Sequence, residues 1–224
     1  MINEILFLSI MLISFIVVLF SFKLGKTWVM LIPPLLLVLA NIFASQVIYI
    51  FGIPSTLALP LYAAIFLSTD IISEHWGKKK ALKVIWMGFA AQILLLIISQ
   101  LILLANVSNM SIQLNEALKI VFGFTPRIVF GSLIAYVISQ NWDVWLFYKL
   151  KKKTHNKQIW LRNNASTISS QLIDSSIFIT IAFYGIVPNI LIFIISAWLL
   201  KILVALLDTP FIYLSYKMLG KKKL

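Results

Sequence analysis

The 224-residue chain has no cysteine, only eight glycines and only seven acidic residues. Without cysteine it can form no disulfide, no thiolate metal site and no cysteine nucleophile. The two histidines, His75 and His155, are far apart in the sequence, with no carboxylate cluster around both. We therefore expect neither a metal site nor a cofactor.

Catalytic signatures are missing as well. The sequence has no His-Glu-x-x-His zinc motif, no Gly-x-Ser-x-Gly nucleophile elbow and no glycine-rich phosphate loop. An intramembrane aspartyl hydrolase would need two carboxylates in one cavity, and the candidates Asp70 and Asp174 are expected at different depths. We expect that the protein is not an enzyme.

Apolar residues, by contrast, are abundant. They make up 61% of the chain, charged residues only 12%, and the mean hydropathy is +1.00, which is too apolar for a water-soluble domain. Because a helix needs about 20 apolar residues to cross a bilayer, we expect an all-α membrane protein, a bundle of seven transmembrane helices in a single domain over residues 1–224. The predicted spans are 5–22, 28–51, 56–72, 82–105, 126–147, 164–184 and 190–213.

The cations alternate between the two sides of these spans. Cations resist translocation and stay cytoplasmic, and sixteen of the nineteen fall on one side. These are Lys23, Lys26, Lys78, Lys79, Lys80, Lys83, Lys149, Lys151, Lys152, Lys153, Lys157, Arg162, Lys217, Lys221, Lys222 and Lys223. The other side has only Lys119 and Arg127. We expect a multi-pass protein of the cytoplasmic membrane with its N-terminus outside and its C-terminus inside, whose net charge of +12 needs no nucleic acid partner.

Several ionisable or amide side chains lie where lipid is expected, and each is costly unless paired or hydrated. At about 1.5 Å of rise per residue, Asn41, Asp174 and Lys201 lie near the bilayer midplane. Lys201 and Asp174 are predicted to form an ion pair or to share a water-filled cavity. Their role is either to fix helix packing or to take part directly in substrate binding or in the coupling of transport. Glu74 and Asp208 are further candidates for coupling or ion pairing. Asp70 and Glu74 are four residues apart, hence on one helix face, where Asp70 is either an interfacial carboxylate or a substrate or proton-coupling group.

The fifth and sixth spans share a short repeat, Ser-Gln-x-x-Asp, which begins at Ser139 and again at Ser170. Helical spacing places each copy on one polar face that ends in an aromatic residue. The two faces hold Tyr136, Ser139, Gln140, Asp143 and Phe147, and Thr167, Ser170, Gln171, Asp174 and Phe178. Such stripes either bind a ligand or hold helices together, and the Gln and Asp of each stripe favour a ligand.

These motifs resemble the queuosine precursor transporter family, also called the vitamin uptake transporter family. The resemblance runs from about Asn41 to Pro210, and its motifs occur in the family's order. They are the run Thr69 to Ala81, Arg127 with residues 132–136, Gln140-x-x-Asp143-x-x-x-Phe147, Leu161-Arg162-Asn163 with Ser166-Thr167, and Asp174-x-x-x-Phe178.

The resemblance implies import of 7-deazaguanine bases (preQ0, preQ1 or queuine) for the queuosine modification of tRNA. It also implies a six-helix core, similar to the substrate-binding components of energy-coupling-factor vitamin importers, plus an N-terminal helix. Proton coupling and facilitated diffusion with metabolic trapping both fit, and so does the alternative that the chain is a binding subunit that needs a separate ATPase module. A homodimer is also compatible with the sequence.

A deazaguanine offers N–H donors, a carbonyl and two flat faces, so we assign candidate partners by type. One of Asp70, Asp143 or Asp174 is expected to accept from the guanine-like edge. One of Asn41, Gln140 or Gln171 is expected to bond the carbonyl side, and one of Tyr136, Phe147 or Phe178 to stack. Arg127 is expected at the outer end of the fifth span, where it either gates the entrance or caps neighbouring carbonyls.

Overall fold

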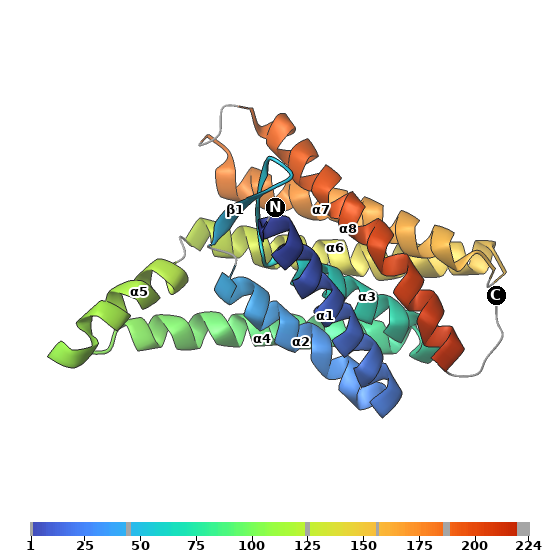
Figure 1. Cartoon of the computed structure of the whole chain (residues 1–224), viewed down its shortest axis with the longest axis horizontal. Helices are drawn as coiled ribbons and strands as arrows, with labels where there is room; N and C mark the ends of the chain where they lie inside the picture. Colours follow the sequence, from blue (N-terminus) through green and yellow to red (C-terminus); the bar gives the residue numbers. More distant parts are fainter. Residues whose placement is uncertain (1, 44–45, 124–125, 156, 186–188, 219–224) are drawn as a thin grey trace.

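The computed structural model describes residues 2–43, 46–123, 126–155, 157–185 and 189–218. It is a bundle of long helices with one small hairpin (Figure 1). In chain order the elements are α1 (Ile2–Leu24), α2 (Lys26–Phe43), β1 (Val47–Ile50), β2 (Ile53–Thr56), α3 (Leu59–Trp76), α4 (Lys78–Leu103), the 3-10 turn η1 (Asn109–Ser111), α5 (Ile112–Phe122), α6 (Pro126–Lys153), α7 (Ile159–Phe183) and α8 (Ile190–Met218).

Helix α3 is the centre of the bundle. It packs against α1, α2, α4, α6 and α8, and every residue from Ala63 to Ser73 is buried. The apolar part of this packing includes Phe15 of α1, whose ring meets Phe211 of α8 edge-on with 4.8 Å between the ring centroids. A helix that is buried on all sides can carry polar groups such as Asp70 only where its neighbours supply polar partners. The functional site is therefore expected around α3.

The second predicted span, residues 28–51, ends as a helix at Phe43, and its last residues form strand β1. β1 pairs with β2 in an antiparallel hairpin whose two turn residues, Phe51 and Gly52, both have positive φ. The β-branched and aromatic run Val47-Ile48-Tyr49-Ile50, followed by a glycine turn, favours this hairpin over a helix. The Asn3 amide donates to the Tyr49 carbonyl at 3.1 Å, so the hairpin is held at the start of α1.

The expectation of an all-α membrane protein with seven long helices needs one refinement. In the described part, α1, α2, α4 and α8 are long and apolar enough to cross a membrane. Helices α3, α6 and α7 have 18 residues or more, but they carry polar side chains that the bundle buries. The outward faces of the four apolar helices expose large residues such as Ile13, Phe20, Leu94 and Leu203, as expected for contact with lipid.

Helix α5 was not predicted. It follows η1 in the connection between α4 and α6, begins beyond the far end of α4 and runs back toward the start of α6, in contact with α4 and α2 (Figure 1). The Gln100 amide of α4 donates to the Phe122 carbonyl of α5 at 2.8 Å. The side chains of α5 are exposed or partly exposed. The lysine-bearing ends of α1, α6 and α8 lie at the opposite end of the bundle.

Candidate functional site

The two Ser-Gln-x-x-Asp repeats face each other across the antiparallel pair α6 and α7. The Ser139 hydroxyl of α6 donates to Asp174 of α7 at 3.3 Å, and the Ser170 hydroxyl of α7 donates to Asp143 of α6 at 3.1 Å. The serine of each copy thus binds the aspartate of the other. The arrangement explains why the motif occurs twice with one spacing, because each copy satisfies the carboxylate of its counterpart.

The predicted contact between Lys201 and Asp174 is present. The Lys201 ammonium of α8 lies 2.6 Å from Oδ2 of Asp174, while Oδ1 of the same carboxylate accepts from Ser139. Both side chains are mostly buried, with 18% and 25% of their surface exposed. The pair is therefore shielded from bulk water but remains reachable by a ligand.

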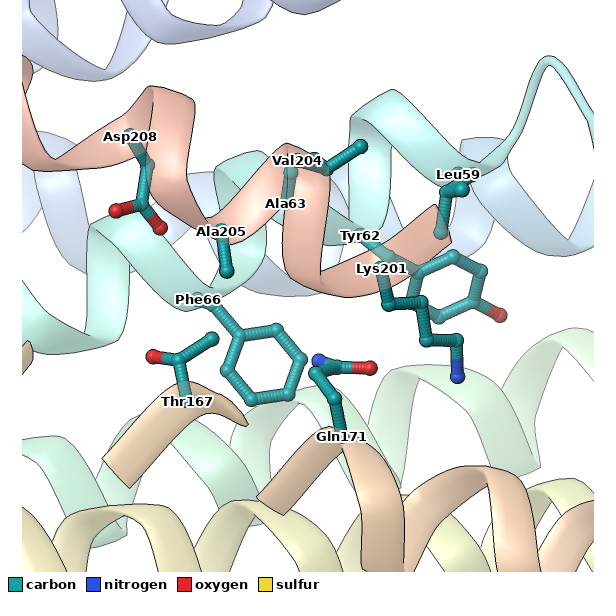
Figure 2. Close-up of a pocket in the computed structure, with 10 residues that line it drawn as sticks. All are labelled: Leu59, Tyr62, Ala63, Phe66, Thr167, Gln171, Lys201, Val204, Ala205 and Asp208. Carbon is teal, nitrogen blue, oxygen red and sulfur yellow. The ribbon is translucent and has the colours of Figure 1, made fainter. Parts of the chain in front are cut away.

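A pocket opens beside this pair, between α3, α7 and α8 (Figure 2). The space between its lining side chains is about 270 Å³ when the open solvent at its mouth is included, and the room in it for water-sized molecules is about 20 Å³. Figure 2 shows Lys201 next to the Tyr62 ring, and Asp208 at the other end near Thr167. The lining residues are Leu59, Tyr62, Ala63, Phe66, Thr167, Gln171, Lys201, Val204, Ala205 and Asp208. The pocket thus combines two aromatic rings, an amide, a cation and a carboxylate.

Three buried carboxyl groups lie around the Asp208 end of the pocket. Asp70 and Asp143 are fully buried, and they interact electrostatically with each other and with Asp208. Thr167, which also lines the pocket, makes a long hydrogen bond of 3.5 Å to Asp70. The Asn163 amide donates to Asp208 at 2.9 Å. This end of the pocket is therefore acidic.

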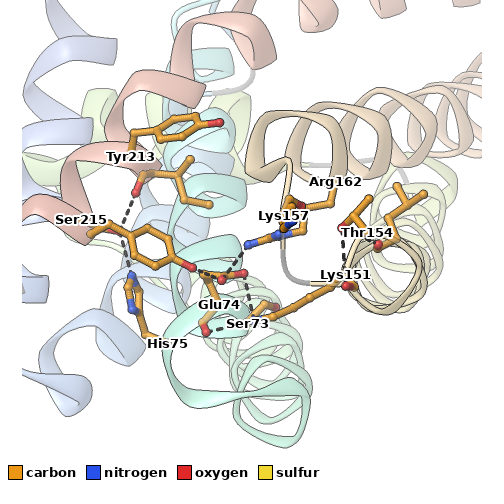
Figure 3. Close-up of polar contacts among 12 residues, drawn as sticks. Ser73, Glu74, His75, Lys151, Thr154, Lys157, Arg162, Tyr213 and Ser215 are labelled. Atoms are coloured by element: carbon orange, nitrogen blue, oxygen red, sulfur yellow. Dashed lines mark hydrogen bonds and ion pairs between the residues drawn. The ribbon is translucent and has the colours of Figure 1, made fainter. Parts of the chain in front are cut away.

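Glu74 is the centre of a second polar cluster, at the lysine-bearing end of the bundle (Figure 3). Its carboxylate pairs with Arg162 of α7 at 2.7 Å and with Lys151 of α6 at 3.0 Å, and it accepts a hydrogen bond from the Tyr216 hydroxyl of α8. The Arg162 side chain is fully buried, and its guanidinium lies over the Phe147 ring at 5.6 Å. The cluster ties together four helices below the pocket.

Of the remaining predicted residues, none whose side chain the structure describes lines the pocket. Asn41 accepts a long hydrogen bond of 3.5 Å from Gln92, which also donates to Ser132, in a cluster between α2, α4 and α6. The Tyr136 hydroxyl donates to the Ile85 carbonyl of α4 at 3.4 Å. Phe178 packs against Phe183. Gln140 is buried, and neither polar atom of its amide has a partner in the described part of the chain. The side chain of Arg127, at the start of α6, lies outside the described residues.

Tyr62 and Phe66, the aromatic walls of the pocket, were missed by sequence reasoning. They lie eight and four residues before Asp70, so the helical face that carries Asp70 continues through both of them. Extending that face backward along the third span would have found them. The same extension along α8 leads from Lys201 through Ala205 to Asp208.

Comparison with known proteins identifies the family of the chain. The family model described as "putative vitamin uptake transporter" matches residues 56–215. The "Probable queuosine precursor transporter" of Bacillus subtilis is 34% identical over 98% of this chain and 97% of its own length. The "Queuosine precursor transporter" of Escherichia coli is 30% identical over 70% of this chain and 68% of its own. No solved structure matches the chain. The chain is a member of the vitamin uptake transporter family.

Proposed function

We propose that the protein imports queuosine precursors, 7-deazaguanine bases such as preQ0, preQ1 and queuine, across the cytoplasmic membrane for tRNA modification. The names of its relatives supply the substrate class. The structural observation that carries the proposal is the Lys201–Asp174 pair beside an aromatic-walled pocket.

The pair matches the edge of a guanine-like base. That edge presents a carbonyl oxygen next to a ring N–H, so it needs a donor and an acceptor side by side. Lys201 and Asp174, 2.6 Å apart, offer these two groups together. In the proposed complex Lys201 donates to the carbonyl, Asp174 accepts from the N–H groups, and the base lies against Phe66 and Tyr62, where aromatic faces favour a flat ring.

Gln171 is the proposed third polar contact. It lies on α7 three residues before Asp174 and lines the pocket between the Lys201 and Asp208 ends (Figure 2). Its amide carries both donors and an acceptor, which suits the ring nitrogens of the base. Asp70 and Asp143 have a supporting role in this scheme, because both side chains are fully buried, whereas Asp174, which pairs with the lining residue Lys201, is 25% exposed.

The proposed topology has seven spans, with the N-terminus outside and the C-terminus in the cytoplasm. The lysine-bearing helix ends then face the cytoplasm, as the distribution of cations in multi-pass proteins favours. The hairpin β1–β2 and helix α5 lie on the outer side. In this orientation the Glu74 cluster closes the route from the pocket to the cytoplasm, so release inward requires Glu74 to part from Arg162 and Lys151.

Uptake by cells that cannot make the precursor tests the proposal. Such cells, expressing this chain alone, should recover queuosine in their tRNA when a labelled 7-deazaguanine is supplied. Lys201→Met and Asp174→Asn should abolish recovery, whereas the control Lys119→Gln, in an exposed pair with Glu116, should not. Failure of the wild-type chain with every compound, despite confirmed membrane insertion, would contradict the proposal of a self-sufficient importer. Loss of accumulation on adding a protonophore would favour proton coupling over facilitated diffusion.

A further inference from the structure

Asp208 presents a buried carboxylate to the pocket at the end opposite the Lys201–Asp174 pair. Only 1% of the residue is exposed. Its Oδ1 accepts from Asn163, but its Oδ2 has no hydrogen-bond partner in the described part of the chain. A buried carboxylate oxygen without a donor is costly, and a ligand that brings a donor removes that cost.

The charges around Asp208 favour a cation. It makes no ion pair within the described residues, because Lys201, the cation that lines the pocket, is 2.6 Å from Asp174. From α3 and α6, Asp70 and Asp143 add two further carboxyl groups near Asp208. From α7, Asn163 and Thr167 contribute neutral groups. The Asp208 end therefore has a surplus of acidic groups, which an ammonium would offset.

We propose that Asp208 is the specificity residue of the transporter, and that it selects 7-deazaguanines whose 7-substituent carries an ammonium over those whose substituent is a neutral nitrile. The inference rests on the proposed function and deepens it. The Lys201–Asp174 pair binds the guanine-like edge that both compounds share, and Asp208 binds the substituent in which they differ.

The spacing of the two subsites fits such a ligand. Lys201 and Asp208 are seven residues apart on α8, which places them on the same face and about 10.5 Å apart along the helix axis. The end of the base far from its 7-substituent is the N–H edge, which the proposed complex places on Asp174 next to Lys201, so a bicyclic base with a one-carbon substituent spans a separation of this order with a polar contact at each end. An ammonium has three donors and can use the unpartnered Oδ2, whereas a nitrile has no donor and would leave the carboxylate unsatisfied.

Competition for uptake tests the inference. In cells that express the wild-type chain, the aminomethyl compound should inhibit uptake of a labelled base about tenfold or more better than the nitrile compound, the ratio expected for one hydrogen bond to a charged group. Asp208→Asn keeps an oxygen to accept from Asn163 but removes the charge. This substitution should weaken inhibition by the aminomethyl compound by a similar factor and leave inhibition by the nitrile compound unchanged. Asp174→Asn should abolish uptake of both compounds alike.

The outcomes separate the two proposals. Uptake of neither compound by a correctly inserted wild-type chain would refute the proposed function and this inference with it. Uptake of both compounds with equal preference would refute the inference alone, and so would an equal loss for both in Asp208→Asn. If Asp208→Asn does not reach the membrane, equal inhibition by the two compounds in the wild-type chain would still refute the inference, because the two compounds differ only in the substituent.

Discussion

Glu74→Gln is expected to be among the most destabilising conservative substitutions in the chain. It removes the charge that the fully buried Arg162 guanidinium faces at 2.7 Å, and it leaves that guanidinium without a carboxylate partner in the described part of the chain. Removing one member of a buried ion pair costs about 3–5 kcal/mol, mostly because the other charge stays buried without compensation. Arg162→Gln should cost less, about 3 kcal/mol, because Glu74 still has Lys151 at 3.0 Å.

Lys151, the more exposed of the two cations that pair with Glu74, should contribute less to stability than Arg162. The Lys151 side chain is 18% exposed, and Glu74 retains Arg162 when it is lost, so Lys151→Gln should cost about 1–2 kcal/mol. Because Glu74 and Arg162 contact each other, the double variant should be more stable than the sum of the single losses predicts, by about 2–3 kcal/mol. Glu74→Gln should thus cost the most because it leaves both cations without their carboxylate, and the two cation variants should follow in the order of how deeply the removed cation is buried.

Equilibrium unfolding of the purified protein in mixed detergent micelles, followed by tryptophan fluorescence, measures these differences. Glu116→Gln provides the matched control, since it breaks a Lys–Glu contact of 2.9 Å whose side chains are 50% and 62% exposed. An exposed pair of this kind contributes little to stability. If Glu74→Gln were no more destabilising than this control, or if the double variant were additive, the account of the Glu74 cluster would be wrong.

Three further predictions address packing and topology. A Cβ at Gly88 would overlap the buried Tyr136 hydroxyl, so Gly88→Ala should lower the free energy of unfolding by about 1–3 kcal/mol, and adding Tyr136→Phe should recover most of it in the same unfolding assay. Trp198→Phe removes the 2.9 Å hydrogen bond from the indole N–H to the Ile168 carbonyl, which joins α8 to α7, and should cost about 1 kcal/mol. Because the chain has no cysteine, an impermeant maleimide added to intact cells should label Glu116→Cys but not Lys152→Cys; the opposite pattern would invert the proposed topology.

The features that could be predicted from the sequence are those that depend on the local pattern of apolar and polar residues. Long apolar runs indicated the long helices, and helical spacing placed the two Ser-Gln-x-x-Asp stripes on facing sides of neighbouring helices. The contact between Lys201 and Asp174 was predictable because these were the two opposite charges expected at one depth.

Other features depend on how distant segments pack, which periodicity does not encode. Glu74 and Arg162 are far apart in the chain, and their contact exists because the end of α3 meets the start of α7. Phe147 was one of three aromatic residues proposed to stack on a ligand, and its ring lies under the Arg162 guanidinium. Strand β1 at Val47–Ile50 was read as part of a helix because its apolar residues follow those of α2 in the sequence with only the polar pair Ser45-Gln46 directly before them.

The crossed serine–aspartate bonds between α6 and α7 have a consequence for motion. Sliding one helix along the other by a single turn would break the Ser139–Asp174 and Ser170–Asp143 bonds together, along with the 3.0 Å bond from the Trp142 indole to Ser169. Several simultaneous losses make such a slide costly, so α6 and α7 should travel as one rigid body. The movement that transports the substrate should then take place between the α6–α7 pair and the helices α3 and α8, along the surface that contains the pocket.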